Sequence, residues 1–301
     1  MLSGIGQVTK TYCDLVGGEY VCYGTDVPSQ ESYDHGFAFV LPIPQQLEII
    51  DKFMINCKKK YYMTVCETET VQNTYGILSK YNPVFVPSLF AKNILERQFP
   101  QMECKLLRHW APTGGPCKEL TPEAPYVFYT IGNIVDPRKN INMLVKAFNV
   151  CQFPNAKLVM KAACNRTVPQ IGKNITIING VLSNDHMDKI HAGCHCYINC
   201  SHSEGVGMGA VEAAMRNKPV IIADYGGLHE YVKTPWVISC KLGKIGFDDF
   251  MFEKDMEWGH PSFDDLVRHM KDCYEKRITS WDHAHTHAIM GEVSTQLQAV
   301  P

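Results

Sequence analysis

Short apolar runs alternate with segments of helical spacing along most of this chain, and this alternation limits the folds open to it. In the second half, residues 126–131 and 156–160 have the length and composition of buried strands, and residues 141–149 between them have apolar side chains at helical spacing. The same pattern predicts strands at 175–178, 196–200 and 219–223 and helices at 185–192, 209–216, 263–276 and 284–297. Such alternation is typical of α/β folds, in which helices cover both faces of a parallel sheet.

The first part of the chain shows the same alternation less regularly. The pattern predicts helices at residues 7–15, 45–57 and 72–80 and strands at residues 21–23, 37–41, 62–66 and 84–86. The lysines at 58–60 are interpreted as the solvated end of the second helix. Ser88 is expected to cap a further helix, because its hydroxyl can accept a hydrogen bond from a free backbone N–H.

Residues 111–118 separate the two parts. This stretch holds two prolines and two glycines, which are the strongest local signals for a break in regular structure. A length of 301 residues also suggests about two domains, at roughly 150 residues each. We therefore expect one domain at residues 1–115, a second at residues 116–283, and a last helix in residues 284–301. Ligands of such sheets bind at the carboxyl ends of the strands.

Charge and cysteine content exclude several classes of function. Lys and Arg total 29 and Asp and Glu total 31, a net charge of −2, which gives no support to a general electrostatic grip on nucleic acid or an anionic membrane. No apolar run approaches the roughly 18 residues of a transmembrane segment. The N-terminus has no signal-peptide pattern, and the thirteen cysteines lack framework spacing. We therefore expect reduced thiols and a cytoplasmic location.

Histidines and cysteines gather near residue 195 without the spacing of a metal site. No paired Cys-x2-Cys occurs there, and Cys196 and Cys200 fall in an expected buried strand, where cysteine behaves as a small apolar residue. No metal site is predicted. The residues of this group are His191, Cys194, His195, Cys196, Cys200 and His202.

A glycine-rich loop with two glutamates follows the expected strand at 196–200. Glu204, Gly205 and Gly207 precede the expected helix, and Glu212 lies within it. Glycines allow close approach to the backbone, and the free N–H groups of a helix start suit a diphosphate. A carboxylate among apolar residues needs partners, and a vicinal diol would supply two. The alternatives are a Glu212–Arg216 pair on the helix surface and an exposed loop position for Glu204.

Residues 201–230 resemble the hallmark segment of the GT-B glycosyltransferases, in particular the large retaining family 4, of the glycosyl transferases group 1 type. The family pattern S-x-x-E-G-x-G-x-x-x-x-E-A, followed by P-V-I-A-S-D-x-G-G-x-x-E, matches this stretch nearly position for position. Upstream, residues 129–140 resemble the opening strand and phosphate loop, and residues 178–181 resemble a strand end that faces the base. Trp281 resembles the aromatic residue that opens the last helix of the family.

The resemblance is strong over residues 124–298 and weaker before them. It implies a GT-B architecture of two Rossmann-like parallel-sheet domains that face a cleft, with a C-terminal helix crossing back to the N-terminal domain. Residues 1–115 would form a shortened domain on the acceptor side, and residues 116–283 would bind the donor. Residues 284–301 would be the returning helix.

The resemblance also implies a role for each matching residue. Glu204 would lie near the donor sugar and Glu212 would bind the ribose. Lys139 would neutralise the charge that develops on the leaving diphosphate. His35 is a candidate for positioning the sugar. The remaining donor-binding positions would be Gly132, Asn133, Arg138, Val181, Gly205, Val206 and Gly207.

Asn133 stands where the family usually has arginine, so that Arg138 would have to complete the diphosphate clamp. The implied reaction moves a sugar from a GDP- or UDP-linked donor to a hydroxyl of a carbohydrate or glycan acceptor, with retention of anomeric configuration and without a metal or cofactor. The loop at 137–140 resembles members that use GDP-mannose. The alternatives are a nucleotide-sugar-binding protein with little or no transferase activity, and an isomerase or phosphorylase on the same fold.

Overall fold

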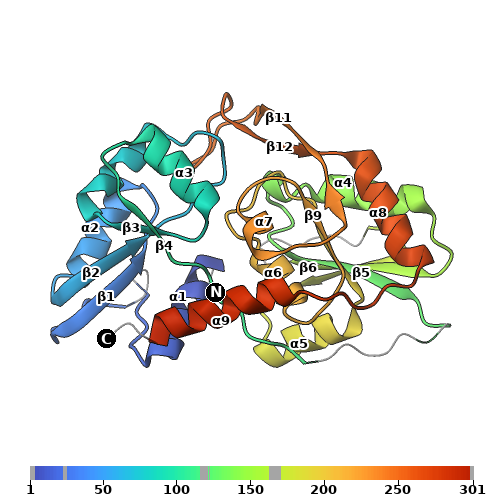
Figure 1. Ribbon diagram of the computed structural model, residues 1–301, viewed down its shortest axis with the longest axis horizontal. Helices are drawn as coiled ribbons and strands as arrows, with labels where there is room; N and C mark the ends of the chain where they lie inside the picture. The colour runs from blue at the N-terminus through green and yellow to red at the C-terminus, as the bar shows by residue number, and fades with distance from the viewer. Residues whose placement is uncertain (1–3, 23–25, 116–120, 122, 163–170, 299–301) are drawn as a thin grey trace. The chain divides into compact units, whose positions relative to one another are not determined.

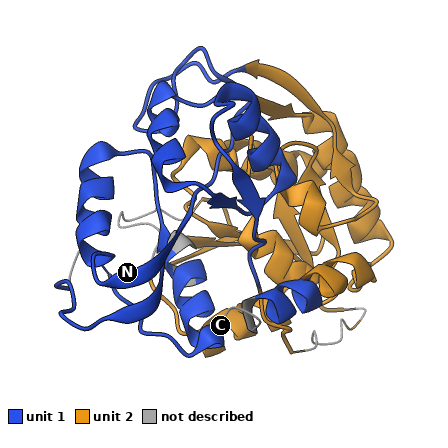
Figure 2. Ribbon diagram, turned by 60° about the vertical axis from the view of Figure 1, so that its left-hand side comes forward, with its two compact units in different colours: residues 1–110, 244–257, 290–301 blue, residues 111–243, 258–289 orange. Residues whose placement is uncertain are grey.

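The computed structural model describes residues 4–22, 26–115, 121, 123–162 and 171–298 (Figure 1). The chain divides into two compact units (Figure 2). The first comprises residues 1–110, 244–257 and 290–301, and the second comprises residues 111–243 and 258–289. Residues 116–118 of the expected linker lie outside the described residues. No helix in the described ranges has both the length and the apolar character to cross a membrane.

The second unit is built on a six-stranded sheet in which every recorded pairing is parallel. Its strand order is β10-β9-β8-β5-β6-β7. Strands β5 to β7 are therefore added toward one edge of the sheet, and strands β8 to β10 toward the other. A crevice for ligands opens at such a reversal, outside the carboxyl ends of the two central strands. The strands are β5 (Tyr126–Gly132), β6 (Ala156–Ala162), β7 (Ile175–Asn179), β8 (Cys196–Asn199), β9 (Val220–Ala223) and β10 (Val237–Ile238).

The helices of this unit pack on the sheet around one apolar core. Phe128, Leu158 and Ile198 of the central strands are fully buried, and Leu144 and Leu266 pack against them from helices α4 and α8. Serine side chains cap α5 and α8, as each accepts a hydrogen bond from an N–H of the first turn. The elements are the 3-10 turn η2 (Pro137–Lys139), α4 (Ile141–Cys151), α5 (Asn184–Gly193), α6 (Met208–Ala214), α7 (Leu228–Tyr231) and α8 (Phe263–Glu275).

The first unit has a smaller parallel sheet whose strand order, β1-β2-β3-β4, follows the sequence. Leu47, Leu78, Val86 and Leu95 are buried in its core. Ser88 caps α3 by accepting a hydrogen bond from the N–H of Ala91, as predicted. The elements are α1 (Gly4–Val16), β1 (Tyr33–Phe39), α2 (Pro44–Phe53), β2 (Cys57–Met63), η1 (Asn73–Tyr81), β3 (Val84–Val86), α3 (Leu89–Gln98) and β4 (Cys104–Leu106).

Two further strands and a long helix complete the chain. Strands β11 (Cys240–Lys244) and β12 (Glu257–Pro261) form a two-stranded sheet, which the sequence did not predict. Helix α9 (Ala284–Gln298) closes the described sequence. The division between the units runs through α9, since residues up to 289 group with the second unit and later ones with the first.

Several expectations for the first unit were wrong. Residues 21 and 22 form no strand, and residue 23 lies outside the described residues. The helix expected to reach residue 57 ends at Phe53, and residues 58–60 belong to strand β2. The lysines are exposed, but their backbone pairs with β1 in the register His35↔Lys59, and this long-range pairing overrides the local pattern. The helix expected at 72–80 is the 3-10 helix η1.

Candidate active site

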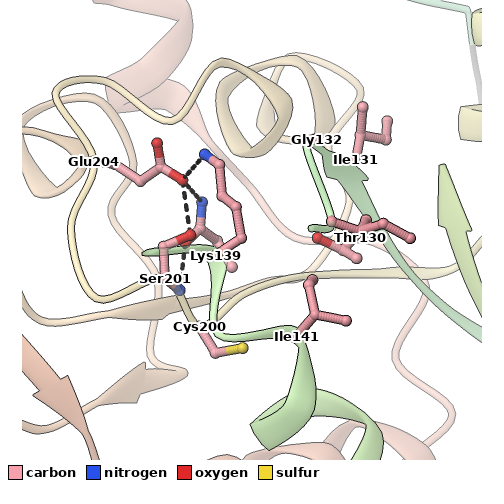
Figure 3. A pocket seen from close by; sticks show the side chains of 10 residues that line it. Thr130, Ile131, Gly132, Lys139, Ile141, Cys200, Ser201 and Glu204 are labelled. Atoms are coloured by element: carbon pink, nitrogen blue, oxygen red, sulfur yellow. Dashed lines mark hydrogen bonds and ion pairs between the residues drawn. The ribbon is translucent and has the colours of Figure 1, made fainter. Parts of the chain in front are cut away.

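A small cavity lies at the reversal of strand order in the second unit, between the chain segments that follow β5 and β8 (Figure 3). Its volume is about 10 Å³, near the minimum for one water molecule. Glu204 and Lys139 both line it and contact each other directly. The lining residues are Thr130, Ile131, Gly132, Ile134, Lys139, Ile141, Asn199, Cys200, Ser201 and Glu204.

The carboxylate of Glu204 is buried and held by the protein through both oxygens. Its side chain is 8% exposed. Lys139 Nζ lies 2.5 Å from Oε1, and the Ser201 hydroxyl donates to the same oxygen at 2.8 Å. The Asn199 amide also donates to Oε1, at 3.2 Å, and Arg138 Nη1 donates to Oε2 at 3.2 Å. Glu204 is therefore not the exposed loop residue that one alternative predicted.

These partners decide the protonation state of Glu204. Burial by itself raises the pKa of a carboxyl group, because it disfavours the charged form. The positive charges of Lys139 and Arg138 outweigh this effect and lower the pKa of Glu204 to about 2. The carboxylate is therefore ionised at every physiological pH, and the charge is matched by cations rather than by solvent.

Arg138 ties the loop after β5 to the loop after β8. Its guanidinium donates to the backbone oxygen of Ser203 at 2.9 Å and pairs with Asp136 at 3.3 Å, besides its contact with Glu204. The N–H of His202 donates to the backbone oxygen of Arg138 at 2.8 Å. Asp136 also caps η2, since its carboxylate accepts from the N–H of Arg138. The two loops thus form one hydrogen-bonded structure.

Glycines allow the loop of residues 226–227 to press on the backbone of Glu204. Gly226 has φ +89°, and a Cβ there would lie 2.5 Å from the Glu204 carbonyl oxygen. The N–H of Gly227 donates to that oxygen at 2.8 Å. Gly207, with φ +75°, is the residue at which the chain turns into α6. Both positions need backbone angles that side chains disfavour.

Glu212 lies on α6 with 30% of its side chain exposed. Its Oε2 is 3.5 Å from Nε2 of His191, a buried side chain on α5. The guanidinium of Arg216 pairs with Asp188 and donates to the backbone oxygen of Glu212 at 2.9 Å. The alternative of a surface pair between Glu212 and Arg216 is thus replaced by contacts to a histidine, an aspartate and a carbonyl.

The other predicted donor-binding positions lie in the same unit. Gly132 lines the cavity, and Asn133 beside it is exposed. Gly205 and Val206, which follow Glu204 in the chain, are buried. Val181 is 67% exposed after the end of β7. The backbone oxygen before it, on Gly180, accepts a hydrogen bond from Lys161 Nζ at 2.8 Å.

His35 lies in the first unit, on strand β1. Its ring stacks on Tyr61 with centroids 5.8 Å apart, and the Tyr61 hydroxyl is 3.3 Å from Nδ1. The structure therefore brings Glu204, Lys139 and Arg138 into direct contact, whereas His35 belongs to another unit with partners of its own. The roles given to these residues by the family resemblance stay predictions.

Sequence reasoning missed four residues that the site uses. Asn199 and Ser201 donate to Glu204, Asp136 pairs with Arg138, and His191 contacts Glu212. The available signal was that Asn199 is polar and ends a strand of otherwise apolar character. Among the described residues, no group of three or more His, Cys, Asp or Glu side chains is arranged to hold a metal ion.

Residues 117–235 match the family model described as glycosyl transferases group 1, a span of less than half the chain. Among solved structures, sucrose-phosphate synthase from Thermosynechococcus elongatus is 14% identical with a TM-score of 0.58, over 98% of this chain and 73% of that chain. TarM is 12% identical with a TM-score of 0.57, over 88% of this chain and 50% of that chain.

The pneumococcal O-GlcNAc transferase GtfA, solved with UDP and GlcNAc, is 13% identical with a TM-score of 0.51, over 83% of this chain and 51% of that one. The chain thus spans about half the length of the last two proteins. No curated protein matches the sequence. At these identities the solved structures show a shared fold, and they are GT-B glycosyltransferases. The chain accordingly has the GT-B fold, and its residues 117–235 match the glycosyl transferases group 1 family.

Proposed function

We propose that the protein is a retaining, metal-independent glycosyltransferase that moves a sugar from a nucleoside-diphosphate donor to a hydroxyl of a carbohydrate or glycan acceptor. One observation carries the proposal. Two cations, Lys139 and Arg138, meet the buried carboxylate of Glu204 at the strand-order reversal of the sheet, within the segment that matches the family.

The cations would bind the diphosphate of the donor. Lys139 and Arg138 carry two positive charges on a short loop, and charge-assisted hydrogen bonds to phosphate oxygens are strong. An arriving diphosphate would compete with Glu204 for both of them. Glu212 would accept hydrogen bonds from the ribose hydroxyls, since its side chain is partly exposed. Gly132, Asn133 and the backbone of residues 205–207 would border the phosphates, and Val181 would face the base.

In the reaction, the bond between the anomeric carbon and the diphosphate oxygen breaks, and a bond to the acceptor oxygen forms on the same face of the sugar. The acceptor proton passes to the departing diphosphate. Lys139 and Arg138 would stabilise the negative charge that grows on this leaving group, which is the main electrostatic contribution such a site can make. His35 remains a proposed sugar-positioning residue from the first unit.

The donor base is proposed to be uracil or guanine. The solved GtfA structure contains UDP, whereas the loop at residues 137–140 resembles GDP-mannose enzymes. A cytoplasmic location is part of the proposal, supported by the eleven described cysteines, all of which are free thiols.

A thermal-shift screen tests the donor site. The protein is heated with GDP, UDP, ADP, TDP and their common sugars, with and without EDTA. A ligand at about 100 times its Kd adds about 2.7 kcal/mol of stability, a plainly visible shift. We expect a shift with one base that EDTA leaves unchanged. A shift that EDTA abolishes would contradict metal independence, and no shift with any nucleotide would contradict the donor site. Proton NMR of the product anomer then tests retention.

The occupied carboxylate of Glu204 favours a second candidate, a nucleotide-sugar-binding protein with little transferase activity. Both oxygens of Glu204 already accept hydrogen bonds from protein groups, which leaves less capacity for a donor sugar. Release of nucleoside diphosphate from the bound donor, followed over time, separates the two functions. Multiple turnovers support the transferase, and stable binding of intact donor with a set of acceptors supports the binding protein.

A further inference from the structure

A buried histidine stands directly behind the carboxylate proposed to bind ribose. His191 lies in the last turn of α5 and is 1% exposed. Its Nε2 is 3.5 Å from Oε2 of Glu212. Among the residues that the structure describes, Nε2 makes no hydrogen bond, and the Glu212 carboxylate lies beside it at ion-pair distance.

The other nitrogen of the ring is fixed by strand β5. The hydroxyl of Tyr129, a fully buried residue, is 2.8 Å from Nδ1 of His191. The two rings meet edge to face at 5.5 Å, and Tyr129 packs in the same manner on Tyr197 at 5.0 Å. The imidazole therefore has a defined position and little freedom to rotate.

These contacts assign the protons. An ionised carboxylate only accepts hydrogen bonds, so the tautomer with its proton on Nε2, 3.5 Å from Oε2 of Glu212, is the one that this neighbour favours. In the neutral ring Nδ1 is then the acceptor, and the Tyr129 hydroxyl donates to it. Burial lowers the pKa of His191 by more than Glu212 raises it, which keeps the ring in this neutral form at pH 7.

The packing of α6 brings Glu212 to this histidine. Gly209, one turn before Glu212 on the helix, lies against Tyr197, and a Cβ there would be 2.3 Å from the Tyr197 hydroxyl. That hydroxyl is itself bound to the backbone of Ile131 at 3.2 Å. A larger residue at 209 would force α6 away from the sheet and move Glu212 away from His191.

We propose that His191 is a positioning residue that holds one oxygen of Glu212 and so presents the carboxylate to the vicinal hydroxyls of the donor ribose. The inference rests on the proposed function, in which Glu212 binds that ribose. Tyr129 acts one step further back, by keeping the proton of His191 on Nε2. A partner that orients a ligating side chain in this way commonly sets how well the ligand is held.

The test measures discrimination between ribose and a sugar that lacks both hydroxyls. Isothermal titration calorimetry gives the Kd of the full chain for UDP and 2′,3′-dideoxy-UDP, and for GDP and 2′,3′-dideoxy-GDP. Hydrogen bonds to a charged group predict that the wild type binds the dideoxy form of its preferred nucleotide roughly 10- to 100-fold more weakly. Glu212→Ala should bring this ratio close to one.

Three variants then isolate His191. In His191→Leu the ratio is expected to fall by about 3- to 10-fold, the effect of losing the one buried polar group beside Oε2 of Glu212. His191→Gln keeps a donor near the position of Nε2 and should restore most of the ratio. His195→Leu is the matched control, because His195 is also buried but accepts from the N–H of Val127 and stacks on Tyr126. It should lower the melting temperature and leave the ratio unchanged.

The outcomes separate the inference from the proposed function. A wild-type ratio near one, or an unchanged ratio in Glu212→Ala, overturns the ribose role of Glu212 and the inference with it. If the wild type discriminates as expected, two results overturn the inference alone. One is an unchanged ratio of the two Kd values in His191→Leu, and the other is an equal fall of that ratio in His195→Leu. Tyr129→Phe removes only a hydroxyl, so it decides the matter if His191→Leu does not fold. The ratio should again fall, and an unchanged ratio overturns the inference.

Discussion

The two sheets of the molecule are both parallel, but they differ in the order of their strands. In the first unit the order β1-β2-β3-β4 follows the chain, whereas in the second the order reverses between β5 and β8. A reversal sends the loops after the two central strands in opposite directions and opens a crevice between them. The candidate site lies at the reversal, with Lys139 after β5 and Glu204 after β8.

The two sheets also differ in how they treat charge near their strands. Glu204 is 8% exposed and paired with two cations. In the first unit, Asp34 and Lys58 pair across β1 and β2 with 74% and 69% of their side chains exposed. Water screens the second pair and solvates it in any state, whereas the first depends on the protein for every partner. Buried, matched charge therefore distinguishes the sheet that carries the candidate site better than charge alone does.

The largest expected effect comes from removing the buried carboxylate. Glu204→Ala leaves Lys139 and Arg138 without the anion between them, and breaking a buried ion pair in this way costs about 3–5 kcal/mol. Asp51→Ala is the matched change in the first unit, where the carboxylate is 38% exposed and accepts from Tyr62 and Tyr81, and we expect a loss of about 1 kcal/mol. Urea unfolding of the full chain measures both, and equal losses would contradict the comparison.

Acid is expected to act on Glu204 in the second unit and on His109 in the first unit in different pH ranges. The pKa of Glu204 is lowered to about 2, from an ordinary value near 4.5. The ionised Glu204 therefore contributes fully to the free energy of unfolding above pH 4.5. This contribution, about 3 kcal/mol, is lost as the pH falls toward 2. In the first unit, burial lowers the pKa of His109 from about 6.5 to about 3. Between pH 6.5 and pH 3 the imidazole of His109 is protonated in the unfolded chain but neutral in the folded one. The free energy of unfolding therefore falls as the pH decreases below 6.5.

Variants isolate these two groups, because buried histidines such as His195, with a pKa lowered to about 4, also occur in the second unit. The free energy of unfolding of the wild type, Glu204→Gln and His109→Gln is measured from pH 8 to pH 2. The free energy of unfolding of the wild type should decrease relative to that of His109→Gln below pH 6.5. Relative to that of Glu204→Gln it should decrease only below pH 4.5. The reverse order would contradict the lowered pKa of Glu204 or of His109.

Two glycines test the close packing of each sheet. A Cβ at Gly226 meets the backbone oxygen of Glu204 at 2.5 Å, and φ is +89°, so Gly226→Ala is expected to cost about 2–3 kcal/mol. A Cβ at Gly36 meets Cys57 Sγ at 2.5 Å and Met54 Sδ at 2.7 Å. Met54 can rotate away, so we expect a cost of about 1 kcal/mol for Gly36→Ala. Thermal unfolding that ranks Gly36→Ala as the more harmful change would refute this order.

The smallest expected effect concerns affinity. Lys139→Ala should weaken binding of the nucleoside diphosphate by about tenfold, as one charge-assisted hydrogen bond is lost, and leave the affinity for the nucleoside unchanged. Lys59→Ala, in the exposed lysine run of the first unit, is the control and should change neither. Calorimetric titration measures the affinities of the wild type and of both variants for the nucleoside and for the nucleoside diphosphate. A uniform loss for nucleoside and diphosphate would place Lys139 away from the phosphates.

Sequence patterns located most elements of the second unit within a few residues. The predicted strands at 126–131, 156–160 and 175–178 are β5, β6 and β7, because each is a short, mostly apolar run that is buried along much of its length. In the first unit the strand β2 was misread. Its lysines come directly after a segment of helical spacing, and only pairing with β1 makes them part of a strand. Short strands with polar faces carry too little local information to be found alone.

For the candidate site, the sequence by itself determined which residues are proposed to carry the chemistry. Glu204 and Glu212 stand in one motif whose glycines and spacing limit the backbone that can form around them, and Lys139 stands in the segment that resembles the phosphate loop of the family. Tertiary structure alone decided that Lys139 and Arg138 share the carboxylate of Glu204, some 65 residues away, and that His191 stands behind Glu212. The reason is physical. A turn or a cap depends on neighbours along the chain, whereas a buried ion pair depends on which strands become adjacent, and that is set by the packing of the whole sheet.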